Sequence, residues 1–143
     1  MNGTSRALTL VAFALLGGLP GFSGCVGISG PADEAYFVAN VKPTLEYYCL
    51  ECHNSTSASK FSGLNLETGK AAMSTGLRRP VIRPGKPEES LLFVVLRLGH
   101  EEALGMPPAP DKVSDEQLAA VRRWIRGGAI WPEGPEGHLK MPQ

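Results

Sequence analysis

Three residues that can do chemistry stand within five positions, in the run Cys49-Leu50-Glu51-Cys52-His53. Two thiols three positions apart on one helical turn can each form a thioether with a vinyl group on one edge of a porphyrin. The adjacent histidine then lies under the ring, where its imidazole can coordinate the iron. The spacing C-x-x-C-H is typical of c-type haem attachment. We therefore expect one covalent haem c, bound through Cys49 and Cys52 with His53 as an axial ligand.

Three other interpretations of this motif stay open. A zinc site needs a second pair of ligands, and outside the motif the sequence offers only Cys25, His100 and His138, which are not paired. A thioredoxin-like dithiol would lie between a strand and a helix, and no βαβ pattern surrounds residue 49. The third interpretation is a chance occurrence in a buried core. An export signal would favour haem over all three.

The composition excludes some functional classes. The 143 residues are 43% hydrophobic and 20% charged with a formal net charge of +0, as in an ordinary globular chain of one domain. No basic stripe follows the sequence, so we expect no nucleic-acid partner.

The amino terminus has the features of an export signal. Arg6 precedes an apolar stretch, residues 7–16, that is too short to span a membrane as a mature helix. Glycines and a proline follow in residues 17–21, and the next tetrapeptide, F-S-G-C, resembles a bacterial lipobox that ends at Cys25. We expect residues 1–24 to be a lipoprotein-type signal peptide and Cys25 to carry the lipid anchor. Plain secretion with a free Cys25 thiol is the alternative.

Export is compatible with haem attachment, because in bacteria the attachment machinery works outside the cytoplasm. We therefore expect a periplasmic or cell-envelope protein that is held to a membrane by the lipid on Cys25.

Helical patterns flank the motif on both sides. Apolar residues between positions 36 and 48 fall on one face of a helix that Pro43 interrupts by a kink or a restart. A capping box from Ser114 to Gln117 opens the clearest helix, and two glycines end it at 127–128. The remaining predictions are a polar loop over 54–62, a short helix over 68–74, a helix start within 85–90 that leads into apolar residues 91–98, and a loose tail after 132.

A methionine is the expected ligand at the sixth position of the iron. Met1 leaves with the signal, Met141 lies in the tail and Met73 lies on a short amphipathic piece. Met106 precedes two prolines, which would hold its loop extended and keep the sulfur aimed. A thioether ligand raises the reduction potential into the range of electron carriers. Axial ligation by His100, an open sixth position and Met106 as a hydrophobic gap-filler are the alternatives.

Three arginines, Arg78, Arg79 and Arg83, lie around two prolines in the middle of the chain. An arginine fork is a good partner for the propionate carboxylates of a haem. Most surface arginines are only solvated, so each of the three is a candidate and none is assigned.

Together these segments resemble the planctomycete-type cytochrome c domain, a small class I type monohaem cytochrome. The resemblance implies an all-α haem fold with Cys49 and Cys52 as thioether attachments, His53 proximal and Met106 distal. Asn54 stands where the family commonly has glycine. The matching pieces, in the family's order within residues 36–132, are V-K-P-T-L at 41–45, the motif at 49–53, G-L-N-L at 63–66, P-G-K-P-E-E-S-L-L at 84–92, M-P-P at 106–108, S-D-E-Q-L at 114–118 and R-W-I-R-G-G-A at 123–129.

The expected protein is an exported monohaem electron carrier, not an enzyme, that passes single electrons to a redox partner protein. A haem enzyme, a gas or peroxide sensor with an open sixth site, and an accessory haem module of a larger complex are the alternatives. The expected organisation is a signal peptide at 1–24, a tether at 25–32, a class I cytochrome c-like domain at 33–132 and a tail at 133–143.

Overall fold

All regular elements that the computed structural model describes are helices, and the described residues contain no strand, which confirms the all-α prediction. The predicted signal peptide at 1–24, Cys25, Arg79 and His100 lie outside the described residues. The described residues are 31–78, 80–98, 102–108 and 111–142.

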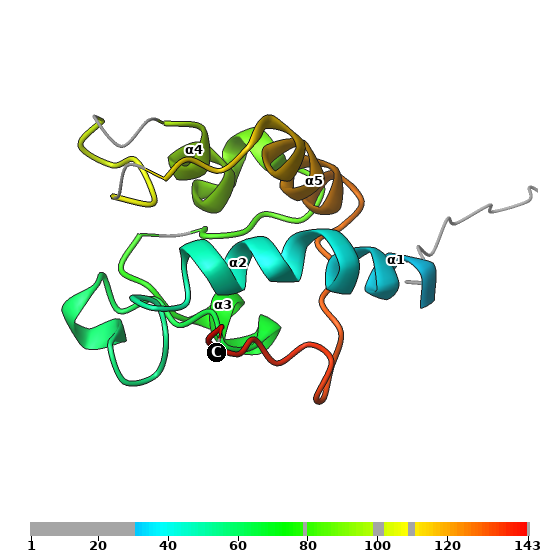
Figure 1. Cartoon of the computed structure of the whole chain (residues 1–143), viewed down its shortest axis with the longest axis horizontal. Helices are drawn as coiled ribbons and strands as arrows, with labels where there is room; N and C mark the ends of the chain where they lie inside the picture. The colour runs from blue at the N-terminus through cyan, green and yellow to red at the C-terminus, as the bar shows by residue number, and fades with distance from the viewer. Residues whose placement is uncertain (1–30, 79, 99–101, 109–110, 143) are drawn as a thin grey trace, which may run out of the picture.

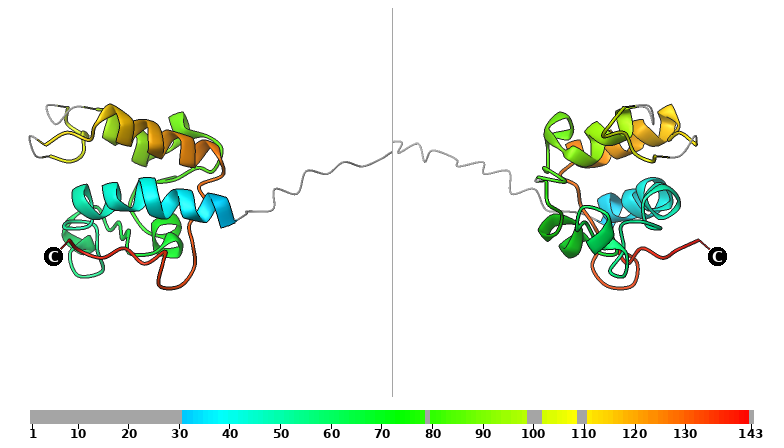
Figure 2. Two further views of the ribbon diagram at one scale, coloured as in Figure 1. Left: turned by 45° about the vertical axis from the view of Figure 1, so that its right-hand side comes forward. Right: turned by 90° about the vertical axis from the view of Figure 1, so that its left-hand side faces the viewer.

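The helices form layers around a central rod. In Figure 1, α1, η1 and α2 run across the middle, with α4 and α5 on one side and α3 and the carboxyl-terminal segment on the other, and both views in Figure 2 agree. In chain order the elements are α1 (Pro31–Tyr36), the π-helical η1 (Phe37–Val41), α2 (Lys42–Tyr48), the 3-10 helix η2 (Ala58–Lys60), α3 (Gly69–Ser74), the 3-10 helix η3 (Pro87–Glu89), α4 (Leu91–Arg97) and α5 (Asp115–Arg126).

The central rod changes its hydrogen-bond register just before Pro43. The N–H of Lys42 donates to the carbonyl of Phe37, five residues back, and Pro43 then lies in the first turn of α2. A proline has no N–H to donate and its ring crowds the carbonyl four residues earlier. The wider π turn accommodates both effects. The predicted interruption at Pro43 is therefore present as a π turn within a continuous rod.

The rod packs against α5 through aromatic side chains. Phe37 is completely buried, and its ring centroid lies 5.3 Å from that of Trp124 and 4.5 Å from that of Trp131. The indole N–H of Trp124 donates to the carbonyl of Ile130 at 2.7 Å, so this buried polar group is satisfied inside the core. Phe37 thus joins the central rod to α5.

Helix α5 begins and ends as the sequence predicts. The hydroxyl of Ser114 accepts the backbone N–H of Gln117 at 3.2 Å, and the Gln117 side chain accepts the N–H of Ser114 at 2.9 Å. The helix stops at Gly127, and Gly128 follows with φ +107°, a left-handed conformation that favours glycine. These signals are local in sequence, which is why they could be recognised in advance.

The segment before α4 differs from the prediction of a helix start within 85–90. Ser90 is extended (φ −93°, ψ 118°), and α4 begins only after it. The buried Ser90 hydroxyl donates to the carbonyl of Lys86 at 2.9 Å and accepts the N–H of Arg83 at 2.8 Å. A serine that bonds nearby backbone in this way competes with helix formation. The acidic residues of this segment therefore lie in η3 and not in the first turn of α4.

The last residues of the chain pack against the domain, contrary to the prediction of a loose tail. Leu139 is 2% exposed and belongs to the hydrophobic core. Its N–H donates to the carbonyl of Glu67 at 2.9 Å, and the next N–H, of Lys140, donates to the Glu46 carboxylate at 2.9 Å. A single leucine among polar residues, glycines and prolines has no helical or strand period, so the sequence pattern could not reveal this contact.

Replacing Leu139 by alanine should therefore destabilise the whole domain. We expect Leu139→Ala to lower the free energy of unfolding by about 2–5 kcal/mol, because a large buried side chain leaves a cavity. Urea unfolding of the purified protein measures the change. The control is Met141→Ala, two positions further on, whose side chain is 49% exposed and should cost little. Equal midpoints for the two variants would show that the segment does not stabilise the fold.

Candidate functional site

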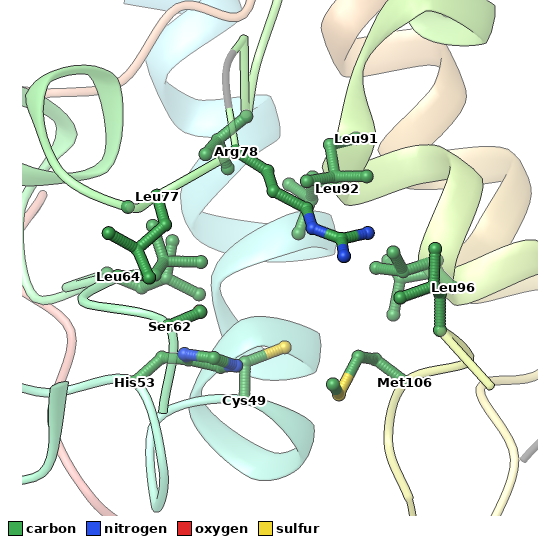
Figure 3. Close-up of a pocket in the computed structure, with 15 residues that line it drawn as sticks. Cys49, His53, Ser62, Leu64, Leu77, Arg78, Leu91, Leu92, Leu96 and Met106 are labelled. Carbon is green, nitrogen blue, oxygen red and sulfur yellow. The ribbon is translucent and has the colours of Figure 1, made fainter. Parts of the chain in front are cut away.

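A mostly apolar cavity of about 290 Å³ lies between the end of α2 and α4 (Figure 3). A cavity with an apolar lining and a few polar groups is typical of cofactor sites. Its walls come from the motif, from the segment after η2, from α4 and from the loop after α4. The lining residues are Cys49, His53, Ser62, Leu64, Leu66, Gly76, Leu77, Arg78, Val81, Leu91, Leu92, Val95, Leu96, Leu104 and Met106.

The motif continues α2 as one further turn. The N–H of Cys49 donates to the carbonyl of Leu45 at 3.1 Å, and the N–H of His53 donates to the carbonyl of Cys49 at 2.9 Å. Cys49 is buried and lines the cavity, whereas Cys52 is half-buried and does not line it. Both are free thiols. The structure thus brings Cys49 and His53 together at one wall, with Cys52 on the same turn.

The raised pKa of the Cys49 thiol argues against a redox-active dithiol. Burial, with a smaller contribution from Cys52, raises the pKa of the Cys49 thiol from 9.0 to about 12. A catalytic dithiol needs a lowered pKa, because the thiolate is the reactive form. No group of three or more His, Cys, Asp or Glu side chains gathers as a metal site among the described residues, so the zinc interpretation finds no ligand set there.

The surroundings of His53 favour the neutral form of its imidazole. Burial lowers the pKa of its imidazole, because the charged form loses hydration; the backbone of Leu64 and Phe61 opposes this shift. Its Nδ1 is buried and has no hydrogen-bond partner among the described residues. An unpaired buried nitrogen is costly, and a neutral imidazole is the form that binds metals. The His53 carbonyl accepts the N–H of Leu66 at 2.8 Å, which fixes the backbone at this point.

Met106 lies across the cavity from His53 (Figure 3). Its N–H donates to the carbonyl of Val95 at 2.9 Å. Val95 lies in the last turn of α4, where helix carbonyls lack a partner within the helix, so the loop uses a free acceptor to attach itself. The Met106 side chain is 37% exposed. Helix α4 thereby determines where the thioether sits.

The other candidate ligands are not at this cavity. Met73 and Met141 are exposed and do not line it, and His138 is also exposed. His100 lies outside the described residues. Among the methionines of the described part of the chain, the cavity therefore contains Met106 alone.

Sequence reasoning noted Asn54 only as a departure from glycine, and the structure gives it a role. Its Nδ2 donates to the carbonyls of Leu50 at 2.8 Å and Glu51 at 3.0 Å. Its Oδ1 accepts the N–H groups of Thr56 and Ser57, each at 2.9 Å. One amide thus closes the end of the motif turn and begins the next loop. The tendency of asparagine to bond the backbone two residues on was the available signal.

The residues at the cavity fit a c-type haem. An imidazole with an orphaned buried nitrogen, an adjacent buried thiol and an apolar surface are the groups that such a cofactor needs. Residues 49–110 match the family model described as Planctomycete cytochrome C. This match supports a planctomycete-type cytochrome c domain at residues 49–110. Searches of the curated proteins and of the solved structures found no match.

The match begins at the first cysteine of the motif and extends past Met106. It does not reach α1, α2 or α5, which join the cytochrome c domain by packing. A domain of this family points to haem c binding and electron transfer, and such domains are typically exported. In the described part of the chain, no helix has the length and apolar character needed to cross a membrane.

The Asn54 amide makes four hydrogen bonds at the motif turn. At about 0.5–1.5 kcal/mol for each bond, Asn54→Ala should destabilise the cytochrome c domain by roughly 2–6 kcal/mol. Chemical unfolding of the purified protein checks this. Asn40→Ala is the matched control, because the Asn40 amide makes one exposed bond, to the carbonyl of Tyr36. If both variants unfold alike, Asn54 does not hold the turn.

Proposed function

We propose that the protein is an exported monohaem c-type cytochrome that exchanges single electrons with a redox partner protein. In this proposal the haem is attached through Cys49 and Cys52, with His53 and Met106 as axial ligands. One observation carries it: His53 and Met106 face each other across an apolar cavity that Cys49 also lines.

The chain's own residues would tune and protect the site, while a bound haem would supply the one-electron iron couple. His53 would offer a neutral nitrogen, since burial lowers its pKa. Leucines such as Leu64, Leu92 and Leu96 would exclude water from both faces of the ring. A low-dielectric surrounding disfavours the more highly charged ferric state and so supports a raised potential.

The alternative of a haem enzyme or sensor finds less support. Acid-base chemistry at an open sixth site needs a titratable group on the distal side. Among the described lining residues, those of α4 and the loop after it are apolar and include Leu96 and Leu104, and the one charged group of the lining, the guanidinium of Arg78, is not a proton acceptor. An electron carrier needs no such group, so the lining favours the carrier over the enzyme.

The proposed distal ligand can be tested by truncation. Met106→Ala should lower the reduction potential by more than 59 mV, a tenfold change for a one-electron couple, because the ligand that favours ferrous iron is lost. Ferrous Met106→Ala should also take up carbon monoxide rapidly, unlike the parent protein. Met73→Ala and Met141→Ala, both exposed and away from the cavity, are matched controls. A Met106→Ala protein with the parent's potential and spectrum would refute the ligand assignment.

We further propose that residues 1–24 are removed and that Cys25 carries a lipid, which would hold the cytochrome c domain to a membrane of the cell envelope. The sequence pattern before Cys25 supports this proposal, and the cytochrome c family, whose members are typically exported, is consistent with it. The three cysteines of the chain then have two separate uses, one for lipid and one for haem.

Two variants can separate these uses. Cys25→Ser should lose the lipid mass and leave the membrane fraction while keeping a haem that acidified organic solvent cannot extract. The double variant Cys49→Ser, Cys52→Ser should keep the lipid and lose covalent haem. Intact mass spectrometry of protein from cells with haem-maturation machinery measures both, and each variant is the other's control. Lipid on the Cys25→Ser protein, or unextractable haem on the double variant, would contradict the respective assignment.

A further inference from the structure

We propose that Arg78 binds the propionate carboxylates of the haem and so fixes the carboxylate edge of the ring at the end of the cavity opposite Cys49. This inference rests on the proposed function and adds to it the group that recognises the acidic part of the cofactor.

Arg78 stands out by its charge among the residues that line the cavity. Of the described lining residues, it alone has a side chain that is charged at neutral pH; the other titratable groups there are Cys49 and His53. Figure 3 shows its guanidinium reaching into the space between the His53 side and the Leu96 side. Arg78 is exposed, so water hydrates its guanidinium, and the guanidinium can pair with an anion that enters the cavity.

Two other arginines of the described chain, Arg83 and Arg122, already pair with carboxylates. Arg83 forms an ion pair with Glu89, and the Nε of Arg122 donates to the Glu88 carboxylate at 2.9 Å. The second pair is strong enough to lower the pKa of Glu88. Arg78 has no carboxylate partner among the described residues, so its fork remains available for one.

The geometry of the ring determines which edge meets Arg78. In a porphyrin of this kind the vinyl groups, which become thioethers, lie on the half opposite the propionates. In Figure 3 the Cys49 thiol lies at the bottom of the cavity, and the Arg78 side chain enters from above, with its guanidinium over the space between the His53 and Leu96 sides. A haem attached at Cys49 would have its propionates on the far half of the ring, on the side from which Arg78 enters the cavity, where Arg78 could pair with them. The neighbouring Leu77 is 85% exposed, so this end of the cavity reaches solvent, as charged groups require.

Pairing of the propionates with Arg78 would raise the reduction potential of the iron. Ionised propionates stabilise ferric iron, and a guanidinium beside them offsets part of their charge. A planar fork can bind a carboxylate through two parallel hydrogen bonds, which a lysine cannot reproduce. Arg78 would therefore favour the ferrous form and keep the propionates ionised at lower pH.

The test compares reduction potentials of holoprotein variants over a range of pH. Arg78→Gln should shift the one-electron equilibrium threefold to tenfold towards ferric iron, at most about 59 mV. It should also move the propionate ionisation, seen as the bend in the plot of potential against pH, to higher pH. Arg78→Lys should lie between Arg78→Gln and the parent. Arg83→Gln removes the same charge from a residue that is paired with Glu89, and should leave both readouts unchanged.

Two results would overturn the inference. One is an Arg78→Gln or Arg78→Lys protein with the potential and pH profile of the parent; the lysine variant decides the matter if the glutamine variant fails to mature. The other is an equal shift in Arg83→Gln, which would reduce the effect to general surface charge. Failure of the proposed axial ligands would appear separately, as a high-spin spectrum of the parent protein, and the Arg78 comparison could still be made on it.

Discussion

The packing of the central rod on α5 is the constraint on which the site depends. Phe37 and Val41 are completely buried on η1, at the face where α5 crosses with Val121 and Trp124. Helix α5 in turn packs against α4. The rod ends in the motif that holds His53, and α4 holds the loop of Met106. The contact around Phe37 therefore sets the separation between the two sides of the cavity, although none of these core residues lines it.

What could be predicted from the sequence was local or periodic. The C-x-x-C-H run, the capping box at Ser114 and the Pro-flanked Met106 are short patterns in which each residue has a direct chemical reason. The apolar face of the central rod repeats with helical period. Signals of this kind survive without knowledge of the fold, because the interacting groups lie within a few positions of one another.

What could not be predicted depends on groups that are far apart in sequence or on a single side chain. Leu139 becomes a core residue only because the chain returns to Glu67, a pairing that no pattern encodes. Helix α4 begins only after Ser90, because the Ser90 hydroxyl bonds the backbone of Lys86 and Arg83. Helix propensities alone do not reveal these two hydrogen bonds. Asn54 had an available signal, but its four bonds could be counted only once the turn was known.

The family match and the packing give different parts of the same explanation. Residues 49–110 contain Cys49, His53 and Met106, so the chemical groups all lie inside the matched region. The side chains that hold those groups at a fixed separation, Phe37 and Trp124 foremost, lie outside it. A potential set by two axial ligands depends on their geometry as well as on their identity. Residues with no counterpart in the matched region are therefore as necessary to an electron carrier built on this chain as the ligands themselves, and substitutions among them would disturb the iron site without touching it.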